Sequence, residues 1–252
     1  KPVETLYSRF SLSGKNYLQK SLVVLQFALA SFLIISTLTI YKQFNFLTKT
    51  DLGYDDSNIV VVNADVNHKD AAVFKAELLK NPNIVDVAPK NAGQWQTSAK
   101  ISNDSSLQFS YETIDESYVP TLKIPLLKGR NFSKAFPSDS TESVLVNEAF
   151  VRKAGWKNPI GETVNFFYNN NEIYQVIGVV KDHHHLTLDQ EIGPQLFTMK
   201  HDNWYGLINV KIKPGSETES LKYIQKSFRQ TLPFSPYSYI FMDNQRIKDY
   251  ES

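Results

Sequence analysis

Residues Ser21 to Tyr41 read SLVVLQFALASFLIISTLTIY and contain no charged side chain. As an α-helix, these roughly 21 residues would be about 31 Å long, which matches the hydrocarbon core of a bilayer. A buried core helix usually has only about 10–14 apolar residues in a row. A signal peptide has an apolar stretch of about 7–15 residues followed by small residues at a cleavage site. The sequence therefore predicts a transmembrane helix, placed at residues 21–46, in which Gln26 is expected to face a neighbouring helix.

The residues on the two sides of this helix differ in charge. The leader, residues 1–20, has four basic residues against Glu4 and carries +3, while the rest of the chain carries about −2. The positive-inside rule places the leader in the cytoplasm, where residues 6–18 could lie along the membrane as an amphipathic helix. Residues 47–252 are then expected outside the cytoplasm. They have no basic excess of the kind that nucleic-acid binding requires.

The composition indicates a folded domain that has no disulfide. The chain has no cysteine, so an exported domain must be stabilised by its hydrophobic core. Hydrophobic residues make up 42% of the chain and aromatic residues 13%, which is typical of a folded domain. About 200 residues follow the helix, enough for one large unit or two subdomains.

Strand and helix patterns alternate along the extracytoplasmic domain. Strands are expected at residues 59–62, 84–87, 107–111, 144–146, 164–168, 173–180 and 208–212. Helices are expected after the cap Asn67, between the cap Asn147 and Gly155, and after a capping box of Ser216 and Glu219. The helix between the first two strands suggests a βαβ unit. This order predicts an α+β (mixed α/β) fold, with one N-terminal transmembrane helix followed by a large mixed-sheet domain.

Two connecting segments are expected between these elements. Residues 93–106 are rich in Ser, Asn and Gln and are expected to form a surface loop with one short strand. Residues 169–171, three consecutive asparagines, are expected to join an antiparallel pair of strands.

No complete catalytic, cofactor or metal-binding motif is present. Asp182 precedes a run of three histidines, residues 183–185, but adjacent side chains on a strand point to opposite faces and cannot converge on one ion. Neither H-E-x-x-H nor a cysteine pair supports a metal site. Ser13-Gly14-Lys15 lacks the upstream glycine of a phosphate-binding loop, and Asn16 replaces its Ser or Thr. We therefore expect one histidine to be hydrogen-bonded inward in an otherwise polar loop, with no catalytic role.

Five stretches resemble, in the correct order, motifs of the MacB/FtsX-like permease subunits of ABC transporters. Residues 22–27 resemble the LVVFQF entry into the membrane, and residues 51–54 resemble the DLGF/Y that follows the helix. Residues 127–132 resemble L..GR.F, and residues 146–161 resemble VNEA followed by GW.NPIG. The last stretch begins at residue 177 and resembles IGVVKDFH with its following proline.

The resemblance has one local departure and implies structural roles for its motif residues. His183 and His185 stand where aromatic residues are usual, and they predict a more polar local surface. Gly155 would end a helix, and Gly129 would free the backbone beside its neighbouring arginine. The residues that we expect to determine the fold are Gly129, Arg130, Asn147, Glu148, Gly155, Trp156, Pro159, Gly161, Gly178, Asp182 and His184.

The resemblance also implies a function and a set of partners. It implies a non-catalytic permease segment in the bacterial inner membrane, with a cytoplasmic N-terminus and a periplasmic MacB-like core domain. Family members couple ATP hydrolysis by a cytoplasmic ABC ATPase subunit to periplasmic movement, called mechanotransmission, for export or extrusion of a cargo. Further implied partners are the other permease half or a second permease chain, periplasmic proteins and membrane lipid. Likeness to the double-length permeases of Bacteroidetes-type bacteria implies an internal fragment from their second half.

An extracytoplasmic sensor domain of a membrane signalling receptor is the alternative function. A pocket lined by polar residues, or a downstream kinase or methyl-accepting region, would favour the sensor. Three further membrane helices downstream, and an adjacent ATPase gene, would favour the permease. An enzyme that uses the histidine run is less consistent with the sequence than either.

Overall fold

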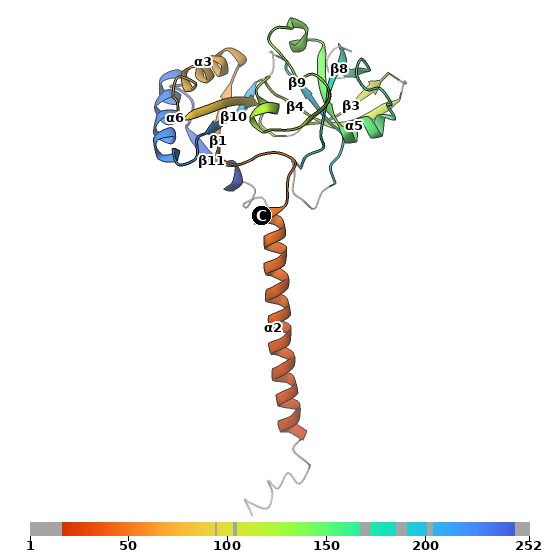
Figure 1. Ribbon diagram of the computed structural model, residues 1–252, viewed down its shortest axis with the longest axis vertical. Helices are drawn as coiled ribbons and strands as arrows, with labels where there is room; N and C mark the ends of the chain where they lie inside the picture. The colour runs from red at the N-terminus through yellow and green to blue at the C-terminus, as the bar shows by residue number, and fades with distance from the viewer. Residues whose placement is uncertain are drawn as a thin grey trace, which may run out of the picture. The chain divides into compact units, whose positions relative to one another are not determined.

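The computed structural model describes residues 17–93, 95–102, 105–166, 172–184, 191–200 and 204–244. The chain forms two compact units, residues 1–50 and residues 51–252. The described part of the first unit is one long helix, α2 (Tyr17–Lys49), which is labelled in Figure 1. The expected amphipathic helix at residues 6–18 lies almost entirely outside the described residues.

Helix α2 has the length and composition of a membrane span. Its segment Gln19–Phe44 has a mean hydropathy of 2.2, and its most apolar part is not buried inside the protein. The core helix of a soluble protein would be mostly buried, so this exposure favours the membrane helix that the sequence predicts. The hydroxyls of Thr37 and Thr39 donate to carbonyl oxygens four residues earlier, which satisfies both polar groups within the helix. The helix extends beyond the predicted 21–46 at both ends.

The second unit contains a four-stranded sheet with the strand order β11-β1-β10-β2, in which all neighbours are antiparallel. Its strands are β1 (Ile59–Val66), β2 (Ile84–Lys90), β10 (Tyr205–Ile212) and β11 (Ser238–Phe241). Helix α3 (His68–Leu78) connects β1 to β2, and α6 (Glu217–Thr231) connects β10 to β11. Each connection joins parallel strands with one strand of the other pair between them, as in ferredoxin-like folds. The predicted βαβ unit is therefore present in this split form.

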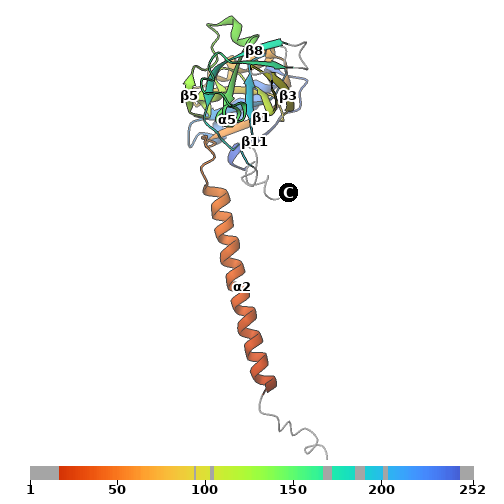
Figure 2. The same cartoon turned by 90° about the vertical axis from the view of Figure 1, so that its right-hand side faces the viewer.

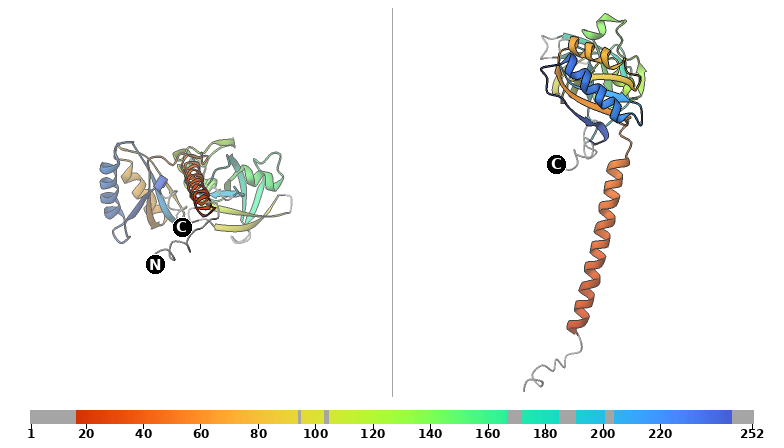
Figure 3. Two further views of the ribbon diagram at one scale, coloured as in Figure 1. Left: turned by 90° about the horizontal axis from the view of Figure 1, so that it is seen from below. Right: turned by 90° about the vertical axis from the view of Figure 1, so that its left-hand side faces the viewer.

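The four-stranded sheet together with α3 and α6 is called the ferredoxin-like subdomain. The two faces of its sheet bury different side chains. Val60 and Val62 of β1 face a core that also contains Phe74 of α3 and Phe228 of α6. The rings of Phe74 and Phe228 meet edge to face with their centroids 5.6 Å apart. Figure 3 (right) shows both helices on one side of the sheet. Because β1 is buried on both faces, its sequence is a continuous apolar run rather than an alternating one.

The residues between β2 and β10 form a second, barrel-like subdomain, which Figure 2 shows from the side of β3, β5 and β8. Its strands are β3 (Trp95–Ile101), β4 (Ser106–Thr113), β5 (Leu126–Gly129), β6 (Ser143–Asn147), β7 (Thr163–Phe166), β8 (Glu172–Val180) and β9 (Gln195–Thr198). Their order is β5-β8-β6-β9-β4-β3-β7, and β7 also pairs with β8. Six strands therefore close into a ring of hydrogen-bonded neighbours. Strand β8 pairs with β7 at its beginning and with β5 at its end.

The described part of the barrel subdomain also contains three short helical elements. They are α4 (Tyr118–Thr121), the 3-10 helix η1 (Pro137–Ser140) and α5 (Glu148–Ala154). Phe150 of α5 is fully buried among side chains of the barrel strands, including Phe109. Helix α5 follows β6 directly, so its N-terminus lies at the end of that strand.

A third core joins the two subdomains. Ile59 and Val61, on the face of β1 that points away from α3 and α6, pack with Leu145, Val180 and Phe197 of the barrel strands. The two subdomains therefore form one body within residues 51–252, consistent with their compactness as a single unit.

Two expectations from the sequence are wrong in detail. Residues 95–101 form the seven-residue strand β3, paired with β4 and β7, and not a surface loop with one short strand. The apolar side of β3 is carried by small residues at alternate positions, such as Thr97 and Ala99, which hid the pattern. The Ser216–Glu219 capping box is absent, because the Ser216 hydroxyl donates to the Lys213 carbonyl oxygen (2.7 Å) and its backbone is not extended. The predicted turn at residues 169–171 lies outside the described residues.

Candidate functional site

The residues that follow α2 in the chain form a junction segment, Asp51–Ser57, which is folded into the second unit. Leu52 is buried, and its carbonyl oxygen accepts a hydrogen bond from the His184 amide (2.8 Å). Gly53 has φ +83°, and a Cβ on it would lie 3.0 Å from the carbonyl oxygen of Asp182. Glycine at this position therefore permits two segments far apart in the sequence to lie in contact.

Asp55 connects the junction segment to both subdomains. Its carboxylate contacts Lys123, which follows α4, at 2.7 Å and Lys211 of β10 at 3.1 Å. Its amide donates to the carbonyl oxygen of Leu122 (2.8 Å). Burial would raise the pKa of Asp55, but hydrogen bonds from Lys123, Ser57 and Lys211 lower it far below its usual range. The carboxylate therefore stays ionised at every physiological pH.

Asp182 and Glu148 link the end of β8 to the start of α5 by two hydrogen bonds to backbone amides. One Asp182 oxygen accepts from the Ala149 amide (2.9 Å) and the other from the Arg152 guanidinium (2.8 Å). Glu148 accepts from the Asp182 amide (3.0 Å). The two residues meet because β6 and β8 are parallel neighbours, which brings the residues after both strands to the same edge. A carboxylate at a helix N-terminus is also favoured by the helix dipole.

Asn147 is the N-cap of α5, as the sequence predicts, and it has a wider role than capping. Its side-chain oxygen accepts from the amides of Phe150 and Gln195, both at 2.9 Å. Its side-chain amide donates to the Gly193 carbonyl oxygen (2.9 Å). Asn147 therefore fixes the segment that enters β9 as well as the first turn of the helix.

The histidine run contributes one side chain to the core. His183 is only 3% exposed, and its ring stacks on Phe197 and meets Tyr54 of the junction segment edge to face. The expectation of a polar surface at His183 is therefore wrong, because the flat imidazole occupies a buried aromatic position. The predicted inward hydrogen bond is present, with Nδ1 lying 3.2 Å from the Lys181 carbonyl oxygen. His184 contributes its backbone amide, and His185 lies outside the described residues.

Gly129 and Gly178 allow β5 and β8 to approach closely. Gly129 has φ +72°, and a Cβ on it would lie 2.1 Å from the Ile177 carbonyl oxygen. A Cβ on Gly178 would lie 2.4 Å from the Arg130 carbonyl oxygen. Any side chain at either position would therefore force these two strands apart.

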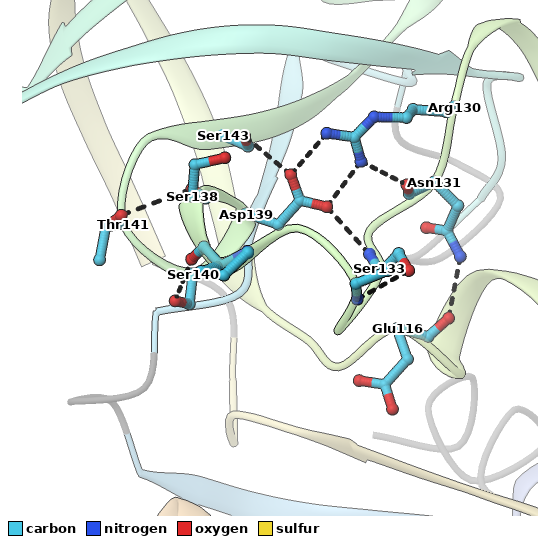
Figure 4. Close-up of polar contacts among 11 residues, drawn as sticks. Glu116, Arg130, Asn131, Ser133, Ser138, Asp139, Ser140, Thr141 and Ser143 are labelled. Atoms are coloured by element: carbon cyan, nitrogen blue, oxygen red, sulfur yellow. Dashed lines mark hydrogen bonds and ion pairs between the residues drawn. The ribbon is translucent and has the colours of Figure 1, made fainter.

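Arg130 holds a loop, residues 130–143, by binding a buried carboxylate (Figure 4). Its two terminal nitrogens donate to the two oxygens of Asp139 at 2.6 and 2.7 Å. Asp139 also accepts from the Ser133 amide and the Ser143 hydroxyl, and its side chain is fully buried. Burial would raise the pKa of Asp139, but the Arg130 and Ser133 hydrogen bonds outweigh it and lower the pKa. The guanidinium also lies 4.1 Å from the ring centroid of Phe136.

The remaining motif residues end α5 and shape the turn before β7. Gly155 has φ +71° and is the left-handed C-cap, as predicted. The Trp156 amide donates to the Val151 carbonyl oxygen, and its ring lies 5.4 Å from that of Phe150. Pro159 is buried, and Gly161, at φ +91°, donates its amide to the Val176 carbonyl oxygen.

The arrangement joins segments and does not converge on a reacting atom. Among the described residues, no group of three His, Cys, Asp or Glu side chains could hold a metal ion. The carboxylates of Asp55, Asp139 and Asp182 are all used by backbone amides or basic side chains. These hydrogen bonds and ion pairs join the junction segment to both subdomains.

Comparison with protein families matches residues 21–223 to the MacB-like periplasmic core domain. The chain belongs to this family. The resemblance to MacB/FtsX-like permeases is thereby confirmed, and the chain is a MacB-like periplasmic domain of an ABC transporter permease. Family membership favours the permease over the sensor alternative. A comparison with curated proteins gives no significant match.

Solved structures share the MacB-like fold at low sequence identity. The periplasmic region of MacB from Actinobacillus actinomycetemcomitans has a TM-score of 0.59 and 18% identity, over 82% of this chain and 98% of that one. The extracellular domain of the noncanonic ABC-type transporter YknZ from Gram-positive bacteria has a TM-score of 0.56 and 13% identity, over 73% of this chain and 100% of that one. A domain assigned to a permease protein from Porphyromonas gingivalis has a TM-score of 0.53 and 14% identity, over 74% of this chain and 91% of that one.

Several residues that organise this MacB-like domain were missed in the sequence. Asp139 has no local signal that would pair it with Arg130. Lys75 of α3 and Asp115, which follows β4, form a largely buried ion pair between the two subdomains at 2.5 Å. Burial raises the pKa of Asp115 to about 6, although Lys75 acts in the opposite direction. Gly53 lies within a stretch that the family resemblance includes, and its positive φ supplies the physical reason for a glycine there.

Proposed function

We propose that this chain transmits conformational change between a membrane helix and a periplasmic domain within an ABC transporter permease. ATP is hydrolysed by a separate cytoplasmic ABC ATPase subunit, and this chain has no chemistry of its own. Movement of the membrane part reaches the periplasmic domain, which acts in export or extrusion of a cargo. Family membership supports this proposal, because the matched residues include both the apolar helix and the folded domain.

The observation that carries the proposal is the way the junction segment is held. A mechanical connection must not be a free linker, because a flexible chain transmits little force. Here the Leu52 carbonyl oxygen accepts a hydrogen bond from the His184 amide, just after β8. The Asp55 carboxylate contacts basic side chains in both subdomains. Displacement of this segment would therefore be transmitted to the end of β8 and to β10 together.

The same proposal fixes the topology and the partners. Residues 1–20 lie in the cytoplasm, residues 21–46 cross the bacterial inner membrane, and residues 47–252 form the periplasmic MacB-like core domain. The charge difference between the leader and the domain supports this orientation. The partners are the ATPase subunit, the other permease half or a second permease chain, periplasmic proteins and membrane lipid.

Hydrogen exchange on the assembled transporter tests the coupling. The permease containing this chain is reconstituted with its ATPase in nanodiscs, and peptides covering residues 51–57 and 181–184 are followed by mass spectrometry. We expect their exchange to change during ATP turnover and to stay constant with an ATPase variant that cannot hydrolyse ATP. Equal exchange in both complexes throughout residues 51–244 would refute transmission through this domain.

A matched pair of glycine variants separates coupling from backbone strain. Gly53 and Gly93 both have positive φ, but a Cβ on Gly93 meets nothing within 4 Å. Gly53→Ala and Gly93→Ala therefore share the same kind of backbone strain, and only the first disturbs the contact with Asp182. We expect Gly53→Ala alone to abolish the ATP-dependent change in exchange while ATP hydrolysis by the partner continues.

A further inference from the structure

A hollow of about 180 Å³ lies between α3 and segments of the barrel subdomain. Its apolar side consists of Ala71, Ala72 and Ala76 of α3, Leu79 directly after that helix, and Pro89 of β2. Its polar side consists of Lys75, Asp115, Glu116, Lys134 and Tyr205, and His68 completes the lining. The hollow thus combines a strip of small aliphatic groups with a cluster of charged and hydroxyl groups.

The two lysines of the hollow are held differently. Lys75 is 13% exposed and contacts Asp115 at 2.5 Å and the Ser117 hydroxyl at 2.7 Å. Lys134 is 67% exposed, and its one described ionic contact is with Glu116 at 2.6 Å. An ion pair of an exposed lysine contributes little to stability, because water and salt screen it. Lys134 can therefore leave Glu116 at small cost, whereas Lys75 is a fixed part of the wall.

Tyr205 provides the second feature that indicates a ligand. The residue is 1% exposed, and within the described part of the chain its hydroxyl has no hydrogen-bond partner. Burying a hydroxyl without a hydrogen-bond partner costs free energy, so a ligand that fills the hollow is expected to supply that partner. Burial raises the pKa of Tyr205 far above its usual value, and the charges of Asp115 and Glu116 raise it further. The two carboxylates make a negative contribution to the electrostatic potential at the phenol oxygen, which favours a cation over an anion there.

We propose that this hollow binds a primary alkylammonium group, which displaces Lys134 from Glu116 and donates to Glu116 and to the Tyr205 oxygen. An ammonium carries three donors and no acceptor, which suits carboxylate and phenol oxygens. Its methylene chain lies along the alanines of α3, where burial of each CH₂ is favourable. The protein's own lysines already place ammonium groups on the carboxylates of Asp115 and Glu116. The ligand is the end of a free aliphatic polyamine or a lysine side chain of another protein.

Calorimetric titration of the full chain in a non-ionic detergent with 1,5-diaminopentane tests the proposal. We expect one saturable site per chain that weakens at high salt, and no binding of hexanoate. Glu116→Gln should weaken binding about tenfold, the effect of losing one charged hydrogen bond. Lys134→Ala should strengthen binding several-fold, because the internal competitor is removed. Tyr205→Phe should weaken binding without changing its salt dependence.

Two charge-matched variants elsewhere serve as controls. Glu77→Gln removes a carboxylate of α3 that pairs with Lys80, and Lys123→Ala removes an exposed lysine that pairs with Asp55. Both should leave diamine affinity unchanged. Absence of saturable binding up to about 10 mM in the folded wild-type chain, or equal affinity in wild type and Glu116→Gln, would overturn the proposal. Nα-acetyl-lysine methylamide distinguishes the sources: affinity equal to that of the diamine favours a protein lysine, and weaker affinity favours a free polyamine.

Discussion

Arg130 and Arg152 each bind an aspartate, but only the aspartate bound by Arg130 has a fully buried side chain. Asp139 is completely buried and bound through both oxygens, whereas Arg152 is 64% exposed and uses one nitrogen. Lysine keeps the charge but cannot form the two-pronged contact. Arg130→Lys should therefore lower the free energy of unfolding by about 1–2 kcal/mol, and Arg152→Lys by no more than about 0.5 kcal/mol. Urea unfolding followed by tryptophan fluorescence measures both, and equal losses would contradict the assignment.

Asp115 should give a pH dependence opposite to that of most aspartates. Its pKa in the folded chain, about 6, lies above the unfolded value of about 3.9, so the folded state binds the proton more tightly. Its contribution to stability is therefore present at low pH and is lost as pH rises from about 4 to about 6. Relative to Asp115→Asn, the wild type should be more stable at pH 4.5 than at pH 7 by about 1–3 kcal/mol. A wild-type advantage that instead grows with pH would show that the Lys75 contact dominates.

Local rules predicted the residues whose partners are close in sequence. Asn147 and Gly155 were identified because capping depends on backbone within a few residues. The partners of Arg130 and Lys75 could not be read from the sequence, because an ion pair carries no signal until the fold brings both charges together. His183 was misjudged for a related reason, since its burial is decided by Tyr54 and Phe197 and not by its neighbours in the chain.

The caps of α3 and α5 provide a comparison between two helices of similar design. Asn67 caps α3 from a partly exposed position by accepting from the Asp70 amide (2.9 Å). Asn147 is fully buried and makes three hydrogen bonds, two of them to the segment at β9. Asn67→Ala should cost about 0.5–1 kcal/mol. Asn147→Ala should cost about 2–4 kcal/mol, because it also leaves buried backbone groups unpaired.

Chemical denaturation of both cap variants, read from the shift in midpoint at constant slope, checks this comparison. A loss in Asn147→Ala no larger than in Asn67→Ala would mean that the contacts with Gly193 and Gln195 add nothing to the cap.

Helix caps and buried strands could be predicted because they depend on local pattern. The closing of β7 onto β8 could not, because strand order depends on pairings between distant segments.

The proposed topology can be checked without background because the chain has no native cysteine. Val73 on α3 is 59% exposed and belongs to the periplasmic domain of the proposal. In intact spheroplasts, Val73→Cys should react with a membrane-impermeant maleimide, whereas Ser11→Cys in the leader should react only after permeabilisation. The reverse pattern would place the domain in the cytoplasm and remove the basis for its proposed role.

The shared core between the subdomains has a consequence for the unfolding of residues 51–252 as a unit. Ile59 of β1 is fully buried against barrel residues such as Leu145, so neither subdomain keeps its packing when the other unfolds. Unfolding should therefore be one cooperative transition. Ile59→Ala should lower stability by about 2–5 kcal/mol through loss of burial and the cavity that remains.

Two probes, one in each subdomain, test this cooperativity. A fluorophore on Val73→Cys reports on the ferredoxin-like subdomain, and the fluorescence of Trp156 reports on the barrel subdomain once Trp95 and Trp204, both exposed, are replaced by Phe. Coincident denaturation curves are expected for the reference protein, and Ile59→Ala should shift both midpoints equally. Separate transitions, or a shift confined to the Val73 probe, would show that the subdomains are independent. A junction segment bound to both would then join two bodies able to move against each other, and transmission would pass through their interface instead of through a single rigid domain.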